Sequence, residues 1–184
     1  FNGHVTRFGQ GGTVGRLHQY HMTVRPWLWF LTRTANCRIF QKKTAADIVK
    51  EVLLNKEYQS VSAFADGDPL AALTEKSKYP EREYCVQYRE TDFNFVSRLL
   101  EEEGIYYFFV HKDGEAQLKL VDSLAGHKPL ENNATIAFLP PNITDQEHIR
   151  SWTFEQNIQP GFVTLDDYDF KNPKANLLVT TAEL

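Results

Sequence analysis

The segment that most constrains the fold is residues 83–110, which read EYCVQYRETDFNFVSRLLEEEGIYYFFV. In its first part, every second side chain is large and apolar: Tyr84, Val86 and Tyr88. Because successive side chains of a strand point to opposite faces, this spacing predicts a strand with one face buried.

A helix and a second strand are predicted directly after it. Thr91 or Asp92 offers a side-chain oxygen to cap the helix, and Gly104 suits the left-handed turn that ends one. Residues 105–110 are β-branched or aromatic, which predicts a strand buried on both faces. The apolar face of the helix is expected to hold Phe93, Val96, Leu99 and Leu100, with Phe95 beside them.

Three consecutive acids end this helix, where the helix dipole disfavours negative charge. Side chains on a helix diverge by about 100° per residue, so the three cannot converge on one metal ion. Two interpretations stay open, a solvated helix end and a charge network at a domain or subunit contact. The candidate interaction residues are Arg82, Arg89, Arg98, Glu101, Glu102 and Glu103.

The segment YCVQYRETDFNFVSRLLEEEGIYYFF resembles the hallmark segment of the VgrG spike proteins of type VI secretion systems, which are similar to the baseplate hub proteins of contractile-tailed phages. Residues 16–41, with the core RPWLWFLTRTANCRIFQ, resemble the preceding segment of that family. The resemblance covers residues 1 to about 161. It implies a structural hub that trimerises, seats on a hexameric tube protein and contacts baseplate components. It also implies assembly in the bacterial cytoplasm and then injection into a target cell.

The predicted fold class is α+β, mainly β, with antiparallel barrel-type domains joined by short helices. Residues 1–41 and 148–184 are expected to supply barrel strands, and residues 42–147 a portion with helices and a hairpin. The chain starts at Phe1 without a methionine, so we expect a fragment of a hub that lacks its spike domain.

The N-terminal half adds several expected elements. Residues 1–8 predict a strand, and the glycine-rich residues 9–15 a hairpin connection instead of a phosphate loop, because no helix follows. Residues 17–34 predict a second strand that bends at Pro26 and then continues its alternation. Thr44 and Asp47 resemble a capping box for a helix. Residues 60–79 are expected to be an insertion or a mobile loop with a turn near Gly67.

The C-terminal half is expected to be strands and turns. Asp113 and Gly114 form a strong hairpin signal, so residues 105–110 should pair antiparallel with residues 117–121. Further strands are predicted at residues 134–139, 149–158 and 162–170, and one starts near residue 177.

Composition and motifs exclude several functions. A net charge of −4 disfavours nucleic acid as the main partner, and no apolar run is long enough to span a bilayer. Nucleophile, metal-protease and nucleotide-binding motifs are missing, so we expect neither an enzyme nor a cofactor. Cys37 and Cys85 are too few for a disulfide scaffold; buried thiols are favoured over one disulfide.

Two other functions are alternatives. A carbohydrate-binding β-domain would use Trp27 or Trp29 as a stacking platform. A lytic enzyme is weaker, because Glu101 and Glu103 diverge on their helix and cannot flank one glycosidic bond. Two further groups are interpreted as ordinary polar residues instead of metal sites: His18 with His21, and Asp166, Asp167 and Asp169.

Overall fold

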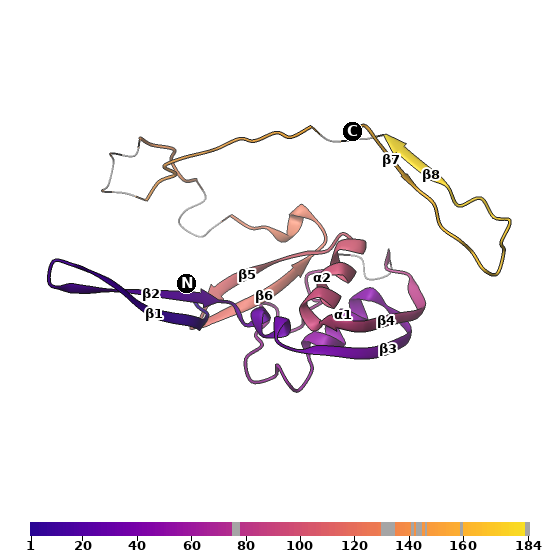
Figure 1. Cartoon of the computed structure of the whole chain (residues 1–184), viewed down its shortest axis with the longest axis horizontal. Coiled ribbons are helices and arrows are strands. Elements are labelled where there is room, and N and C mark those ends of the chain that lie inside the picture. Colours follow the sequence, from indigo (N-terminus) through magenta and orange to yellow (C-terminus); the bar gives the residue numbers. More distant parts are fainter. Residues whose placement is uncertain are drawn as a thin grey trace. The chain divides into compact units, whose positions relative to one another are not determined.

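The computed structural model divides into two compact units, Phe1–Lys128 and Pro129–Leu184 (Figure 1). It describes residues 1–74, 78–129, 135–140, 142, 145, 147–158 and 160–182. The division that the sequence predicts, with residues 1–41 and 148–184 sharing a barrel, stays a prediction.

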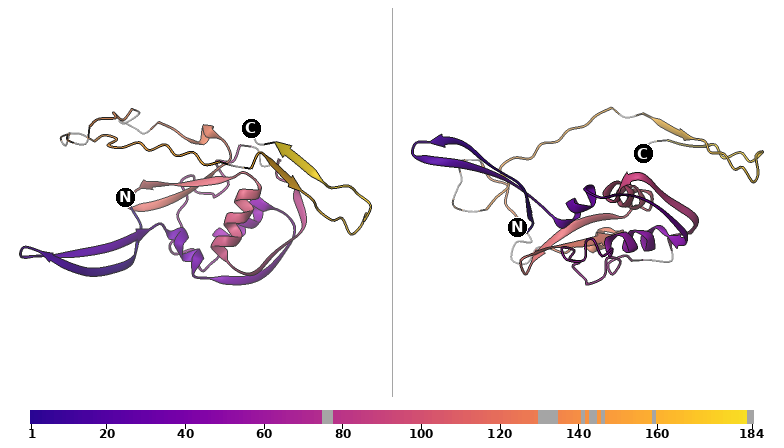
Figure 2. Two further views of the ribbon diagram at one scale, coloured as in Figure 1. Left: turned by 45° about the horizontal axis from the view of Figure 1, so that its top comes forward. Right: turned by 60° about the horizontal axis from the view of Figure 1, so that its bottom comes forward.

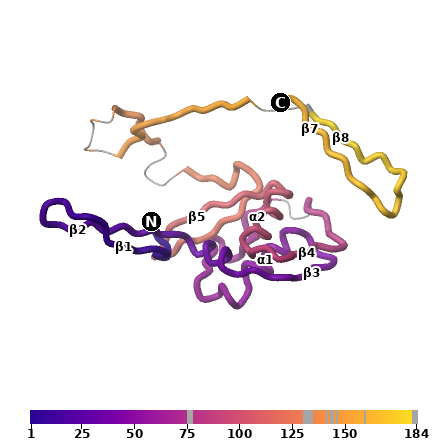
Figure 3. Tube along the Cα trace, in the orientation of Figure 1, coloured from indigo at the N-terminus to yellow at the C-terminus, as the bar shows by residue number. Residues whose placement is uncertain are grey.

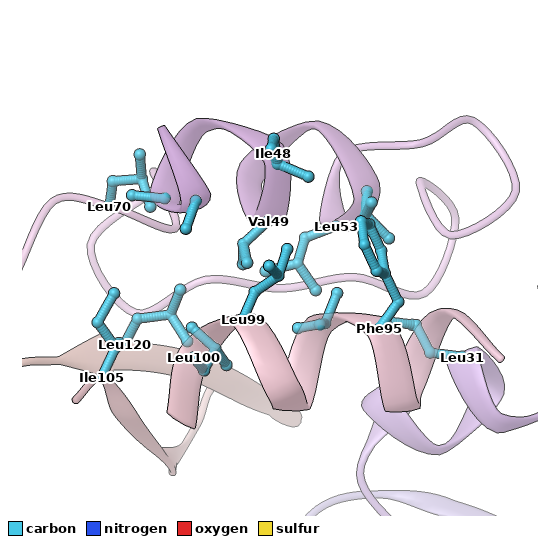
Figure 4. Close-up of a cluster of buried hydrophobic side chains, with 14 of the residues drawn as sticks. Leu31, Ile48, Val49, Leu53, Leu70, Phe95, Leu99, Leu100, Ile105 and Leu120 are labelled. Atoms are coloured by element: carbon cyan, nitrogen blue, oxygen red, sulfur yellow. The ribbon is translucent and has the colours of Figure 1, made fainter. Parts of the chain in front are cut away.

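Two helices form the core of the first unit. Helix α1 (Ala45–Leu53) and helix α2 (Asp92–Glu102) pack against each other, and Figure 4 shows their apolar side chains meeting between them. The predicted caps are present, since the Thr44 hydroxyl accepts from the Asp47 N–H at 3.1 Å and Thr91, not Asp92, caps α2. Fully buried members of this core include Leu31, Ile48, Val52, Leu53, Phe95 and Leu99. Each contributes about 1.5–3 kcal/mol through its removal from water.

Strands β3 (Ala35–Thr44) and β4 (Glu81–Thr91) lead into these helices and pair antiparallel as a two-stranded ribbon. The register places Ile39 opposite Val86 and Phe40 opposite Cys85. The strand predicted before α2 is therefore confirmed.

The hairpin predicted at Asp113 and Gly114 is confirmed. Strands β5 (Tyr106–Lys112) and β6 (Glu115–Val121) pair antiparallel, and both turn residues have positive φ, as a tight primed turn requires. The expectation that residues 105–110 are buried on both faces is wrong. Residues 107–110 are half-buried and Tyr106 is exposed, because β6 is the only strand paired with β5 among the described residues.

A long hairpin precedes β3. Strands β1 (His4–Val14) and β2 (Leu17–Arg25) pair antiparallel, and Figure 2 shows them extending away from the helices of the unit. The glycine-rich residues are part of β1, and the turn lies at Gly15 and Arg16, so the predicted hairpin is present but its strands run further. The strand predicted after Pro26 is wrong. Pro26 caps the 3-10 helix η1 (Trp27–Thr32), which buries Trp27, Leu28 and Leu31 at helical spacing.

The described part of residues 60–79 packs onto the core. Gly67 has φ of +75° in the predicted turn, and Leu70 and Leu73 are buried. Tyr58, just before this stretch, and Tyr79, at its end, are also buried. Residues 75–77 lie outside the described residues.

The second unit contains little regular structure. Strands β7 (Phe162–Leu165) and β8 (Val179–Ala182) form an antiparallel hairpin with a long connection, visible in Figure 3. The longer strands predicted there are mostly wrong. Residues 149–158 form only one bridge, from Ile149 to Phe138, and residues 166–170 are not a strand. The strand predicted at 134–139 shows only that bridge, and residue 134 is outside the described residues.

The fold is thus mainly β with few helices, and its named strands pair antiparallel. Within the described residues, these strands form four separate two-stranded sheets and no closed barrel. A short 3-10 helix, η3 (Leu124–Gly126), follows β6.

Candidate assembly interface

The β3–β4 ribbon is inverted relative to an ordinary surface ribbon. Its outer face carries four large apolar side chains, Ile39, Tyr84, Val86 and Tyr88, which are 45–67% exposed. Its inner face, toward the helices, carries polar Arg38 and Gln87 beside Phe40 and Cys85. The sequence predicts the half-buried strand correctly, but the buried face is the one that holds Cys85 and Gln87.

Asp92 explains why the polar residues face inward. Its carboxylate is fully buried and accepts hydrogen bonds from four side chains in β3, β4 and the loop after α1. The donors are Arg38 at 2.5 Å, Gln87 at 2.7 Å, Tyr58 at 2.8 Å and Asn36 at 3.2 Å. Because Arg38 and Gln87 must point at Asp92, the alternate residues of both strands point outward.

The charge of Asp92 is stabilised by its partners. Burial alone raises the pKa of a carboxyl group, but hydrogen bonds from Gln87, Tyr58, Asn36 and Arg38 outweigh it and hold the pKa of Asp92 below its usual range. The pKa of Tyr58 is raised, chiefly by burial, with the neighbouring Asp92 carboxylate adding to the shift. Asp92 is therefore ionised and Tyr58 is a neutral donor at neutral pH.

A second buried carboxylate, Asp122, connects Thr74, Lys78 and Tyr79 to the end of β6. It accepts from the Thr74 N–H at 3.1 Å and the Tyr79 hydroxyl at 2.9 Å, and Lys78 lies 3.0 Å away. Burial raises the pKa of Asp122, but these bonds outweigh it and hold the pKa well below its usual range. The sequence pattern does not predict either carboxylate as an organising residue. For Asp92, the signal in the sequence is that the polar residues Asn36 and Arg38 stand at alternate positions of β3, on the face where both donate to its carboxylate.

Four of the six candidate interaction residues come together. Arg82, at the start of β4, bonds Glu102 and Glu103 at 2.7 Å each, so it compensates the acidic end of α2. Arg98 bonds Glu90 at 2.8 Å and lies 3.9 Å from Glu102. These pairs are partly exposed contacts within the chain, each worth about 0.2–1 kcal/mol.

Arg89 and Glu101 lie outside this network. Arg89 has φ of +51°, and its guanidinium lies 5.2 Å from the ring centroid of Tyr88, on the ribbon. Glu101 is exposed on α2. The interaction role of all six residues stays a prediction.

In the described part of the chain, no three His, Cys, Asp or Glu side chains are grouped so that they could hold a metal ion. Both cysteines are free thiols, and only Cys85 is buried, so the expectation of two buried thiols is wrong for Cys37. Trp27 is 1% exposed and donates to the Ala63 carbonyl, which excludes it as a sugar platform. No helix in the described residues has the length and hydropathy of a membrane span.

The geometry defines a β-rich protein with a helical core and an exposed apolar ribbon. Residues 1–183 match the family model for the phage tail baseplate hub (GPD), and the chain belongs to that family. It is similar to the type VI secretion system spike proteins VgrG1b and VgrG1c of Pseudomonas aeruginosa, with 43% and 42% identity over 97% of this chain. It is 34% identical over 97% of its length to a Vibrio cholerae protein named actin cross-linking toxin VgrG1.

A solved structure supports the fold. The Escherichia coli c3393 protein, described as a type VI secretion component structurally similar to the T4 tail proteins gp27 and gp5, aligns with a TM-score of 0.58 and 27% identity. The alignment covers 76% of this chain and 36% of that one. The chain spans about a quarter of the length of the two Pseudomonas relatives (23% and 24%).

Proposed function

We propose that this chain forms part of the hub of a type VI secretion spike, and that its role is structural and non-enzymatic. The observation that carries the proposal is the continuous match to the baseplate hub family over residues 1–183. In the assembled state the hub is a trimer that seats on the hexameric tube protein and contacts the baseplate. It assembles in the bacterial cytoplasm and is then injected with the tube.

The inverted ribbon supports this role. An isolated two-stranded sheet is marginally stable in water, and contiguous exposed apolar side chains typically mark contact surfaces. We assign the outer face of β3–β4 to contacts inside the assembled hub, with Arg89 beside it as a flanking contact. The barrel that the family resemblance implies is completed by such contacts.

The carbohydrate-binding alternative is not favoured, because Trp27 is a core residue and Trp29 lies between two arginines.

The test is binding to purified tube rings. The chain is fused to a neutral trimeric coiled coil and sedimented with tube rings, and the coiled coil alone serves as control. The fusion is expected to co-sediment with the rings far more than the coiled coil alone does, because three linked contacts add avidity. A trimer that stays in the supernatant at all ring concentrations contradicts the tube-seating role.

A further inference from the structure

An apolar groove with a basic rim lies beside η1 in the first unit. Its floor is formed by Leu28, Phe93, Tyr107 and Phe109, and Pro26, Trp29 and Thr32 line one side. Arg25 also lines it. The floor brings together three elements, η1, α2 and β5, so the groove has a packed base.

The guanidinium of Arg25 lines the groove, and that of Arg33 lies over the ring of Trp29, another lining residue. Arg25 and Arg33 lie 5.9 and 5.7 Å from the ring centroid of Trp29. Neither forms a salt bridge with any carboxylate in the described ranges, although eight other cations of the first unit do so within it: Arg38, Lys43, Lys50, Lys78, Arg82, Arg98, Lys112 and Lys119. An apolar groove with two cations gathered at its Trp29 edge fits an aromatic segment that carries carboxylates.

The chain itself contains such a segment in its second unit. Residues 165–170 read LDDYDF, and Leu165, Tyr168 and Phe170 are 68–75% exposed. Asp166 and Asp167 are exposed, and each accepts a hydrogen bond from the backbone N–H of the next residue, which leaves further lone pairs. The second unit holds 3 Lys or Arg and 8 Asp or Glu, a net charge of −5, whereas the first unit holds 17 and 16, a net of +1.

Symmetry decides which copy supplies the segment. A closed ring of identical chains requires two different surfaces, one on each side of every contact. The groove and the acidic aromatic segment are two different and complementary surfaces. We propose that the groove binds residues 165–170 of a second copy of this chain, head to tail around the ring; this rests on the trimeric hub role proposed above.

Cross-linking between chains tests the proposal directly. In a Cys37→Ser background, one chain carries Thr32→Cys on the groove rim and a differently tagged chain carries Tyr168→Cys. Mixing them under mild oxidation is expected to give a disulfide between the two tags. Glu155→Cys, exposed elsewhere in the second unit, replaces Tyr168→Cys as control and should give about tenfold less.

Charge reversal provides a second readout that does not depend on the cysteines. Arg25→Glu with Arg33→Glu is expected to lower self-association, measured by light scattering, about tenfold or more, and adding Asp166→Lys with Asp167→Lys to the same chain restores it. Cross-linking at the Glu155→Cys level, or only within a chain carrying both cysteines, overturns the proposal. If the chain still binds tube rings in that case, the proposed hub role is retained, and only the proposed contact between the groove and residues 165–170 is rejected.

Discussion

The Arg38 guanidinium lies 2.5 Å from the Asp92 carboxylate, whose side chain is fully buried. This ion pair joins the first residues of α2 to the middle of β3. Since the same carboxylate also accepts from Gln87 on β4, one acidic side chain fixes which face of the ribbon turns inward. The exposed apolar face of the ribbon is therefore a consequence of the polar core beneath it.

Removing the Asp92 carboxylate is expected to destabilise the first unit strongly. Asp92→Ala leaves Arg38 and Gln87 without their buried acceptor, and breaking such a pair costs about 3–5 kcal/mol. Urea unfolding followed by tryptophan fluorescence measures the change. Asp113→Asn, at an exposed hairpin position, is the matched control and should change the free energy of unfolding by less than about 0.5 kcal/mol. A loss below about 1 kcal/mol for Asp92→Ala would show that the network is not organising the ribbon.

The same carboxylate predicts acid sensitivity. The pKa of Asp92 is lower in the folded chain than the value of about 3.9 expected for an unfolded one. Its contribution to stability is therefore complete above about pH 4 and is lost as the pH falls through the folded pKa. The pKa of Asp122 is also lowered in the folded chain, so Asp122 likewise loses its contribution to stability as the pH falls. Unfolding free energies measured between pH 6 and pH 2 should fall below about pH 4, with a shallower slope in Asp92→Asn; equal slopes would contradict this assignment.

Arg82 is expected to stabilise α2 and not to bind a neighbouring subunit. Arg82→Gln loses two partly exposed salt bridges and leaves Glu102 and Glu103 uncompensated at the helix end, for a loss of about 1 kcal/mol. Thermal unfolding measures the loss, and Lys112→Gln, at an exposed position of the β5–β6 hairpin, is the control. If Arg82→Gln leaves stability unchanged but lowers assembly, the network belongs to a subunit contact instead.

The ribbon's outer face is expected to matter for assembly and not for folding of the chain alone. Ile39→Thr with Val86→Thr keeps β-branched residues at a cross-strand pair and makes the exposed face polar. The unfolding free energy should change by less than about 1 kcal/mol, while the intact protein's self-association weakens. Val163→Thr, at a comparably exposed position of β7, is the control. A large loss of stability with unchanged assembly would place this face in a role within the chain.

Much of the first unit could be predicted from the sequence. The alternation in β4, the caps at Thr44 and Thr91, and the turn at Asp113 and Gly114 are local signals, and each is present in the structure. They agree with one another, so neighbouring residues alone specify these elements.

The remaining features depend on partners distant in sequence. Trp27, Trp29 and Leu31 alternate like a strand, yet burial of Trp27, Leu28 and Leu31 against α2 selects a 3-10 helix after Pro26. The inward face of β4 could not be assigned either, because Tyr84, Val86 and Tyr88 are the more apolar set. Asp92, supplied by the next helix, reverses that preference by binding Gln87. The strand predicted at residues 149–158 is absent apart from one bridge, and the strand predicted at 162–170 ends at Leu165, because alternation without a paired neighbour does not make a sheet.

The central claim, that the chain is part of a trimeric hub, is tested most directly by the absolute mass of the intact protein in solution. Light scattering across a concentration series, at two ionic strengths, gives the number of copies in each particle. The hub account predicts three copies, with the trimer persisting at the lowest concentration measured. A single copy at every concentration, or an even-numbered assembly, would contradict it.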